Sequence, residues 1–261
     1  MDRTQCRVYK RSMLSDSIAI IGGTGLASLQ GLVITRRETL ETPYGELSAP
    51  LAIGSLHGRE VVFLARHGES HTIPPHRVNY RANLWALKHL GICRVISVCA
   101  VGGISQDAGP GVIMIPDQII DYTWSRAHTL FEDNLNVVTH IDFTEPYCEA
   151  LRQELLAAAG RAGIVILEKG TYGATQGPRL ETAAEIDRME RDGCDIVGMT
   201  GMPEASLARE LGLCYAACAV SANAAAGRGS GPITMEAIEV VLADGMERVM
   251  RIVGQAIAGA D

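Results

Sequence analysis

The chain contains 261 residues, 47% of them hydrophobic, and carries a formal net charge of −7. This length suits one large α/β domain with a substantial core. The modest acidity excludes a dominant basic surface and argues against a nucleic-acid partner. The sequence contains no run of about 18 apolar residues, so we expect neither a transmembrane helix nor a membrane partner.

Residues 1–16 are polar and mildly basic, and they lack an apolar stretch of signal-peptide length. We interpret them as a flexible N-terminal extension, and residues 17–261 as a single domain. The seven cysteines are scattered and lack the CxxC spacing of zinc and redox motifs. We therefore expect buried, reduced thiols in a cytoplasmic protein, with Cys99 as a special case treated below.

The first half of the chain alternates β-rich runs with one helical segment. Ser17–Ile21 is a short apolar run that ends in Gly22-Gly23-Thr24-Gly25, a pattern typical of a strand followed by a tight loop. Val78, Ala82 and Trp85 share one face of a predicted helix that Gly91 ends. The expected elements are strand 17–21, strand 60–65, helix 78–90, strand 94–99, strand 112–116 and strand 118–122.

The second half repeats this rhythm. Thr144 is predicted to cap a helix that has Pro146 in its first turn, and Thr182 with Glu185 forms a capping box. The expected elements are a helix from 144, strand 169–174, helix 182–192, strand 195–198, helix 203–211, strand 215–220 and a final amphipathic helix after 234. Strands that alternate with helices imply an α/β layered fold with a parallel or mixed sheet.

Small and polar residues follow several of these strands, where α/β folds gather their ligands. Glycines let backbone N–H groups approach a phosphate, Thr adds a neutral donor, and Arg supplies a planar fork. The clusters are Gly22–Gly25, Arg66–His67, Cys99–Gly103, Met199–Thr200 and Ser221–Asn223.

Each cluster alone is weak evidence for a phosphate site, so other functions are also considered. His67, His71 and His76 could suggest a metal site, but no carboxylate pattern accompanies them, so we predict no metal. Gly23-Thr24-Gly25 resembles a dinucleotide fingerprint that lacks its third glycine, which makes an oxidoreductase a distant alternative. A non-catalytic nucleoside-binding protein is another.

Together these segments resemble the trimeric purine nucleoside phosphorylase and methylthioadenosine phosphorylase family, from about Ile18 to Gly254. The matching motifs, in order, are IIGGTGL, ARHGESHTIPPHRVNYRANLWAL, VCAVGGI, QGPRLETAAE, VGMTGMPEASLARE and AVSANAAAG. The resemblance implies an α/β single domain with a mixed, distorted, barrel-like β-sheet flanked by helices, and a homotrimer. It also implies that phosphate attacks C1′ of a nucleoside with inversion, without a metal or organic cofactor.

The resemblance also assigns residues to the phosphate and the ribose. The phosphate-binding residues would be Thr24, Arg66, His67, Ala100 and Thr200, and Met199 would pack against the ribose. The family usually carries Thr or Asn at Cys99, and a thiol is a poorer hydrogen-bond donor. Cys99 is therefore either a phosphate contact or a buried thiol at a strand end.

The base pocket separates subfamilies. Methylthioadenosine phosphorylases carry two aspartates in the segment that here contains Asn223, Ala224 and Ala225. Glu181 can accept from N1–H of a 6-oxopurine, and Asn223 can reach O6 and N7 and stabilise the departing base. An ionised Glu181 facing adenine N1 would oppose two acceptors, at a cost of about 1–3 kcal/mol. The alternative for Glu181 is a carboxylate that only favours the helix N-terminus.

The residue expected near the 5′ position of the sugar also differs between members of the family. Family members that act on 5′-hydroxyl sugars typically place His where this chain has Met235, and a thioether suits a methylthio group. His140 is expected to reach this pocket from a neighbouring subunit. The pattern favours S-methyl-5′-thioinosine as the substrate in purine salvage. Two other activities remain open: general cleavage of inosine and guanosine, and cleavage of methylthioadenosine. It also remains open that Met235 only packs its helix against the core.

Overall fold

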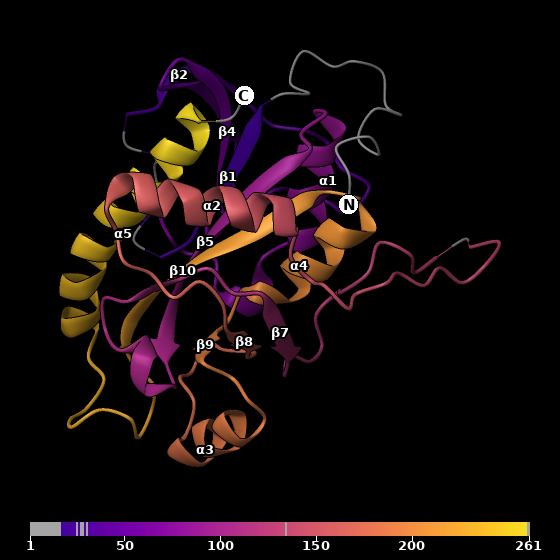
Figure 1. Cartoon of the computed structure of the whole chain (residues 1–261). Coiled ribbons are helices and arrows are strands. Elements are labelled where there is room, and N and C mark those ends of the chain that lie inside the picture. The colour runs from indigo at the N-terminus through magenta and orange to yellow at the C-terminus, as the bar shows by residue number, and fades with distance from the viewer. Residues whose placement is uncertain (1–16, 25, 27–28, 30, 134, 260–261) are drawn as a thin grey trace.

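The computed structural model describes residues 17–24, 26, 29, 31–133 and 135–259, so the expected extension 1–16 lies outside the described residues. The described part forms a mixed sheet surrounded by helices (Figure 1). The strands are β1 (Ile18–Gly22), β2 (Val33–Glu38), β3 (Leu51–Leu56), β4 (Arg59–Ala65), β5 (Arg94–Gly103), β6 (Ile113–Met114), β7 (Gln118–Asp121), β8 (Thr171–Ala174), β9 (Ile196–Gly198) and β10 (Cys214–Ala224). The helices are α1 (Tyr80–His89), α2 (Glu149–Ala162), α3 (Ala183–Arg191), α4 (Gly201–Glu210) and α5 (Met235–Ala258), with short 3-10 turns at Pro75–Arg77 and Gln106–Ala108.

Strand β5 is the centre of the sheet, because three other strands pair with it. β1 and β10 run parallel to β5, whereas β9 pairs antiparallel with its last two residues. β4 continues the parallel array beyond β1, and the order along the sheet is β2-β3-β4-β1-β5-β9-β8-β7. The predicted mixed α/β sheet is confirmed, and the carboxyl ends of β1, β4, β5 and β10 lie at one edge.

The helices cover the sheet with their apolar faces. α2 packs on α5 and both pack on β10, while α4 lies against α1 and β10, and α3 stands apart (Figure 1). Of the four positions of α5 that the sequence predicts to face inward, Ile238, Leu242 and Val249 are at most 8% exposed, whereas Val241 is only half-buried. None of the described helices combines the length and the apolar composition needed to cross a bilayer.

The hairpin of β2 and β3 was not predicted from the sequence. β2 reads VITRRE and is almost entirely exposed, so it shows no alternation of apolar and polar residues. In β3, an added Cβ at Gly54 would lie 2.3 Å from the carbonyl oxygen of Val33. The two strands therefore approach too closely for a side chain there, and charged residues protect the outer edge.

The predicted start of α2 is wrong. Cys148 is the N-cap residue and the helix begins at Glu149, so Thr144 is not its cap. Thr144 lies in a turn in which its N–H donates to Oδ1 of Asp142, 3.0 Å away, and its carbonyl accepts from Gln118. These local hydrogen bonds compete with helix formation, as Asp and Thr side chains often do.

The prediction that all cysteines are reduced is also wrong. Cys148 and Cys214 form a disulfide, whereas Cys99, Cys194 and Cys218 are buried free thiols. The start of α2 lies beside the start of β10, where the N–H of Cys148 donates to the carbonyl of Tyr215 at 2.8 Å. A separation of 66 residues in sequence hid this pairing, which only the packing of α2 on β10 creates.

Candidate active site

Ten of the twelve site residues expected from the sequence line one cavity of about 380 Å³, at the edge where the parallel strands end. They are Thr24, Arg66, His67, Ala100, Glu181, Met199, Thr200, Asn223, Ala225 and Met235. The other two do not line it: Ala224 belongs to β10 beside the cavity, and His140 is exposed on the segment between β7 and α2. Among the described residues, no group of three or more His, Cys, Asp or Glu side chains could hold a metal ion.

Strand register explains why distant residues meet here. Gly22 of β1 pairs with Ala65 of β4, so the loops that carry Thr24 and Arg66 lie side by side. The N–H of Arg66 donates to the carbonyl of Gly22 at 3.0 Å. Because β9 runs antiparallel to β5, the chain after β9 returns alongside Cys99 and brings Thr200 to the same wall.

The floor of the cavity is a buried ion pair between Arg66 and Glu204, which are 0% and 2% exposed. The guanidinium donates Nε–H and Nη2–H to the two carboxylate oxygens at 2.7 and 2.9 Å. Ser97 and Tyr215 also donate to this carboxylate, at 2.7 and 2.8 Å. Burial alone would lower the pKa of Arg66, but Glu204 raises it well above the ordinary value.

One N–H group of Arg66 remains for a ligand. The other four donate to Glu204, to Oγ of Ser97 and, through Nη1, to the carbonyl of Val98. A Cβ at Gly23 would lie 2.9 Å from Nη1 and 2.6 Å from the Val98 carbonyl. Glycine at this position therefore lets the loop pack directly against the guanidinium, so that both line the same part of the cavity.

His67 is held as a neutral ring. Its Nδ1 lies 2.8 Å from the carbonyl oxygen of Ile73, so Nδ1 carries the proton and donates. Burial and the cation of Arg66 lower the pKa of His67 to about 4. The neutral ring therefore keeps a lone pair on Nε2, which can accept a hydrogen bond from a protonated phosphate oxygen.

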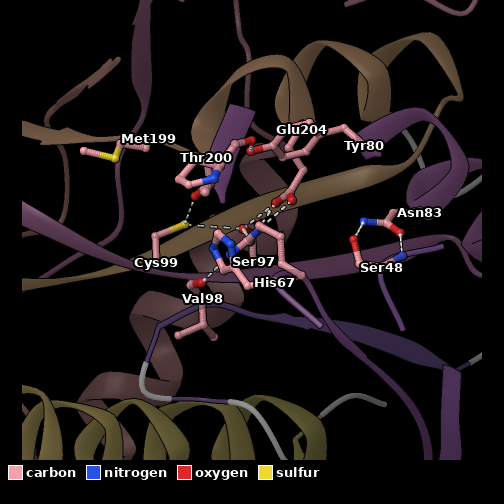
Figure 2. A network of polar contacts seen from close by, with 12 residues as sticks. Ser48, His67, Tyr80, Asn83, Ser97, Val98, Cys99, Met199, Thr200 and Glu204 are labelled. Carbon is pink, nitrogen blue, oxygen red and sulfur yellow. Dashed lines mark hydrogen bonds and ion pairs between the residues drawn. The ribbon is translucent and has the colours of Figure 1, made fainter. Parts of the chain in front are cut away.

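Cys99 takes part in a line of contacts along the same wall. Oγ1 of Thr200 donates to its sulfur at 3.7 Å, and Oγ of Ser97 lies 3.4 Å from it. Figure 2 shows these contacts running from Thr200 through Cys99 and Ser97 to Glu204. The thiol lines the cavity and at the same time fixes the hydroxyl of Thr200.

Glu181 and Asn223 face the cavity from two different segments. Oε1 of Glu181 accepts from Oγ1 of Thr175 at 2.6 Å, which leaves Oε2 as an acceptor for a ligand. Nδ2 of Asn223 donates to the carbonyl of Ala224 at 2.7 Å, so one N–H and the amide oxygen remain. Oε2 of Glu181 can accept from the N1–H of a 6-oxopurine, and the free N–H of Asn223 can donate to its O6 or N7.

The far end of the cavity is apolar. Met235 is the first residue of α5, and Ile233 and Ile238 line the cavity beside it. The hydroxyl of Thr234 accepts from the N–H of Ala237 at 3.3 Å, which fixes the start of the helix. Met235 itself is 59% exposed, so this end is open in the single chain.

Sequence reasoning missed the residues that orient the expected ones. Glu204 lies within the quoted motif VGMTGMPEASLARE, and a carboxylate in the first turn of a helix among small and apolar residues was the available signal. Thr175 directly follows β8, another strand end. Ser97 lies inside β5, where nothing in the sequence distinguished it from a small core residue.

Comparisons with known proteins agree with this geometry. The model of the family described as "Phosphorylase superfamily" matches residues 17–258. A Pseudomonas syringae pv. tomato protein named "probable S-methyl-5′-thioinosine phosphorylase" is 54% identical over 242 residues, which cover 93% of this chain and 98% of that protein. The 6-oxopurine nucleoside phosphorylase of Pyrococcus furiosus is 44% identical over 245 residues, which cover 92% and 91% of the two chains. Methylthioadenosine phosphorylase from Schistosoma mansoni in complex with adenine has a TM-score of 0.89 at 32% identity, covering 93% and 91%.

The lowered pKa of His67 predicts a pH-dependent stability. The neutral ring stabilises the fold fully above pH about 6.5, and this contribution is lost as the pH falls toward 4, where the native ring must charge. We expect His67→Gln to remove on the order of 2 kcal/mol of the pH dependence of the unfolding free energy between pH 7 and 4. Urea unfolding at both pH values measures this, and an equal dependence in variant and wild type would contradict the assignment.

Proposed function

The chain belongs to the phosphorylase superfamily, and we propose that it cleaves S-methyl-5′-thioinosine with inorganic phosphate. The products are hypoxanthine and S-methyl-5-thio-α-ribose 1-phosphate, so the chain is a pentosyltransferase of purine salvage. One observation carries the proposal: a single cavity joins an anion-binding floor, a carboxylate and an amide suited to a 6-oxopurine, and an apolar end. We place the reaction in the cytoplasm, where inorganic phosphate is available.

Phosphate binds on the floor of the cavity in this proposal. The remaining Nη1–H of Arg66 and the hydroxyl of Thr24 donate to it, and the wall at Ala100 closes around it. The hydroxyl of Thr200 turns from the sulfur of Cys99 to donate to the bound phosphate, and Nε2 of neutral His67 accepts from a P–OH group. Because Glu204 already neutralises Arg66, these directional contacts fix the anion more than net charge does. A positioned anion beneath C1′ stabilises the positive charge that develops there.

The reaction breaks the N9–C1′ bond while a phosphate oxygen bonds to C1′ from the opposite face. The bonding pair moves onto the purine, which gains a proton to leave as hypoxanthine. The proton balance closes because the P–OH group of the phosphate loses one proton as the sugar phosphate becomes a dianion. The remaining N–H of Asn223 donates to N7 and stabilises this charge, while Oε2 of Glu181 accepts from N1–H. Met199 contacts the ribose between them. Each step uses protein side chains and phosphate, so we expect the reaction to need no metal or organic cofactor.

The methylthio group occupies the apolar end formed by Ile233, Met235 and Ile238. A thioether and two branched alkyl groups offer apolar contacts to a methylthio group and no hydrogen-bond partner to a hydroxyl. The second candidate, a general 6-oxopurine nucleoside phosphorylase like the Pyrococcus furiosus relative, shares the base pocket and differs at this end.

We further propose that the chain works as a homotrimer. His140 is exposed and lies outside the cavity of its own chain, so it can serve a 5′ pocket only in a neighbouring copy. The same segment exposes the apolar side chains of Val137 and Val138, at 77% and 67%, which favours burial against another subunit. Sedimentation of the purified protein as a monomer would contradict this arrangement.

An assay of three nucleosides tests the proposal. The purified protein is incubated with phosphate and S-methyl-5′-thioinosine, inosine or S-methyl-5′-thioadenosine, and the free base is quantified. We expect the highest kcat/KM for S-methyl-5′-thioinosine and no release without phosphate. Preferred cleavage of inosine would favour the second candidate, and phosphate-independent release or no release would reject phosphorolysis of these nucleosides.

Replacing the base-contacting amide should change base preference. Asn223→Asp combined with Ala225→Asp restores the two carboxylates that methylthioadenosine phosphorylases carry, so we expect the kcat/KM ratio of methylthioinosine to methylthioadenosine to fall at least about tenfold. Ala225 is 3% exposed, and Asn223→Asp alone is therefore measured in parallel as the variant that avoids a new buried charge. An unchanged ratio in both variants rejects the base-pocket assignment.

The apolar end should set the sugar preference. Met235→His supplies a hydrogen-bonding partner for a 5′-hydroxyl at the first turn of α5, an exposed position that tolerates the change. We expect kcat/KM for inosine to rise about tenfold relative to methylthioinosine, the effect of roughly one hydrogen bond. Met235→Leu serves as the apolar control, and a ratio that does not differ between the two variants rejects the assignment.

A further inference from the structure

Arg126 is a buried arginine beside the cavity that no motif in the sequence singled out. It lies between β7 and α2, does not line the cavity and is 8% exposed. Its guanidinium donates to five oxygen atoms at 2.6–3.1 Å and lies 5.7 Å from the centre of the Tyr80 ring. These five oxygens are backbone carbonyls or the amide oxygen of Gln176. Nη1 also donates to the hydroxyl oxygen of Tyr80 at 3.5 Å, and none of the acceptors belongs to a carboxylate.

Three of these contacts hold the segment that binds the base. Nη2 donates to the carbonyls of Thr175 and Gln176 at 3.0 and 2.7 Å, and Nε donates to Oε1 of Gln176 at 3.1 Å. The hydroxyl of Thr175 in turn donates to Glu181, the acceptor for purine N1–H. The position of the Thr175 backbone therefore sets the position of the Glu181 carboxylate.

The remaining two contacts hold the segment that binds ribose and phosphate. Nη1 donates to the carbonyls of Met199 and Met202 at 2.8 and 2.6 Å. Met199 and the adjacent Thr200 line the cavity. Met202 has non-helical backbone angles inside α4 and lies two residues before Glu204, the ion-pair partner of Arg66.

We propose that Arg126 is a positioning residue that fixes the base-binding segment 175–181 relative to the phosphate-binding segment 199–204. A guanidinium is planar, so its rigid fork imposes a fixed spacing on the carbonyls that it joins. A lysine ammonium retains the positive charge and cannot span both segments in this geometry. This inference rests on the proposed function, because it assigns Arg126 a role in selecting the base.

Arg126→Lys tests the proposal, with Arg152→Lys as the matched control. Arg152 is 5% exposed and also donates to backbone carbonyls, those of Pro116, Glu168 and Ile115, none of which lines the cavity. Both variants remove one buried carbonyl-binding guanidinium and keep the charge. Gln176→Leu, which removes one accepting oxygen and keeps Arg126, is the milder companion variant.

Activity and selectivity are both measured. A misplacement of about 1 Å can cost roughly a hundredfold in rate, so we expect Arg126→Lys to lose about that much kcat/KM and Arg152→Lys to lose less than about threefold. Selectivity for methylthioinosine over methylthioadenosine should fall about tenfold in Arg126→Lys, because Glu181 is no longer held in place. Gln176→Leu should shift selectivity in the same direction. A purely structural role would reduce both substrates equally.

Hypoxanthine binding, measured by calorimetry, separates this inference from the proposed function. A wild-type protein that neither binds hypoxanthine nor releases it from methylthioinosine rejects the proposed function. An active wild type whose Arg126→Lys and Gln176→Leu variants both keep its selectivity, or whose Arg152→Lys variant loses selectivity as strongly, rejects the positioning role. Weaker hypoxanthine binding in Arg126→Lys than in Arg152→Lys supports it.

Discussion

The buried ion pair of Arg66 and Glu204 is the contact on which the site depends. It joins the end of β4 to α4, two elements separated by 138 positions in sequence. Removing two charges from water costs several kcal/mol each, and the pair is tolerable only because both groups are bidentate and further hydrogen-bonded. The carboxylate therefore fixes the guanidinium in one orientation before any ligand arrives.

This constraint shapes how an anion can be bound. Glu204 balances the charge of Arg66, and His67 stays neutral because its pKa is lowered to about 4. The floor of the cavity is consequently close to neutral, so in the proposed function phosphate recognition rests on directed donors and on the close approach of the glycine loop. A site of this kind is organised in advance, so little reorganisation is required as charge develops at C1′.

In the proposed function, the two ends of the cavity rather than the fold decide which nucleoside is cleaved. The Pseudomonas syringae relative, the Pyrococcus furiosus relative and the Schistosoma mansoni structure carry names that refer to three different nucleoside classes, yet all match more than 90% of this chain. A common sheet can serve all three, since a few side chains at the base and the 5′ end decide the substrate. In the function that we propose for this chain, those side chains are Glu181 and Asn223 at one end and Met235 at the other.

From sequence alone, hydrophobic periodicity predicted most of the helices and strands, and the strand-end motifs predicted cavity residues such as Arg66, His67 and Thr200. They did so because helix faces and strand ends are local properties, as in the capping box of Thr182 and Glu185. The resemblance to the family added Glu181 and Met235. The tertiary structure decided what the local pattern does not contain: the partner of Arg66, the support of Glu181 by Thr175, the edge strand β2, and the disulfide of Cys148. Each of these depends on which distant segments the sheet brings together, and the physical reason is that burial and pairing are properties of the packed chain.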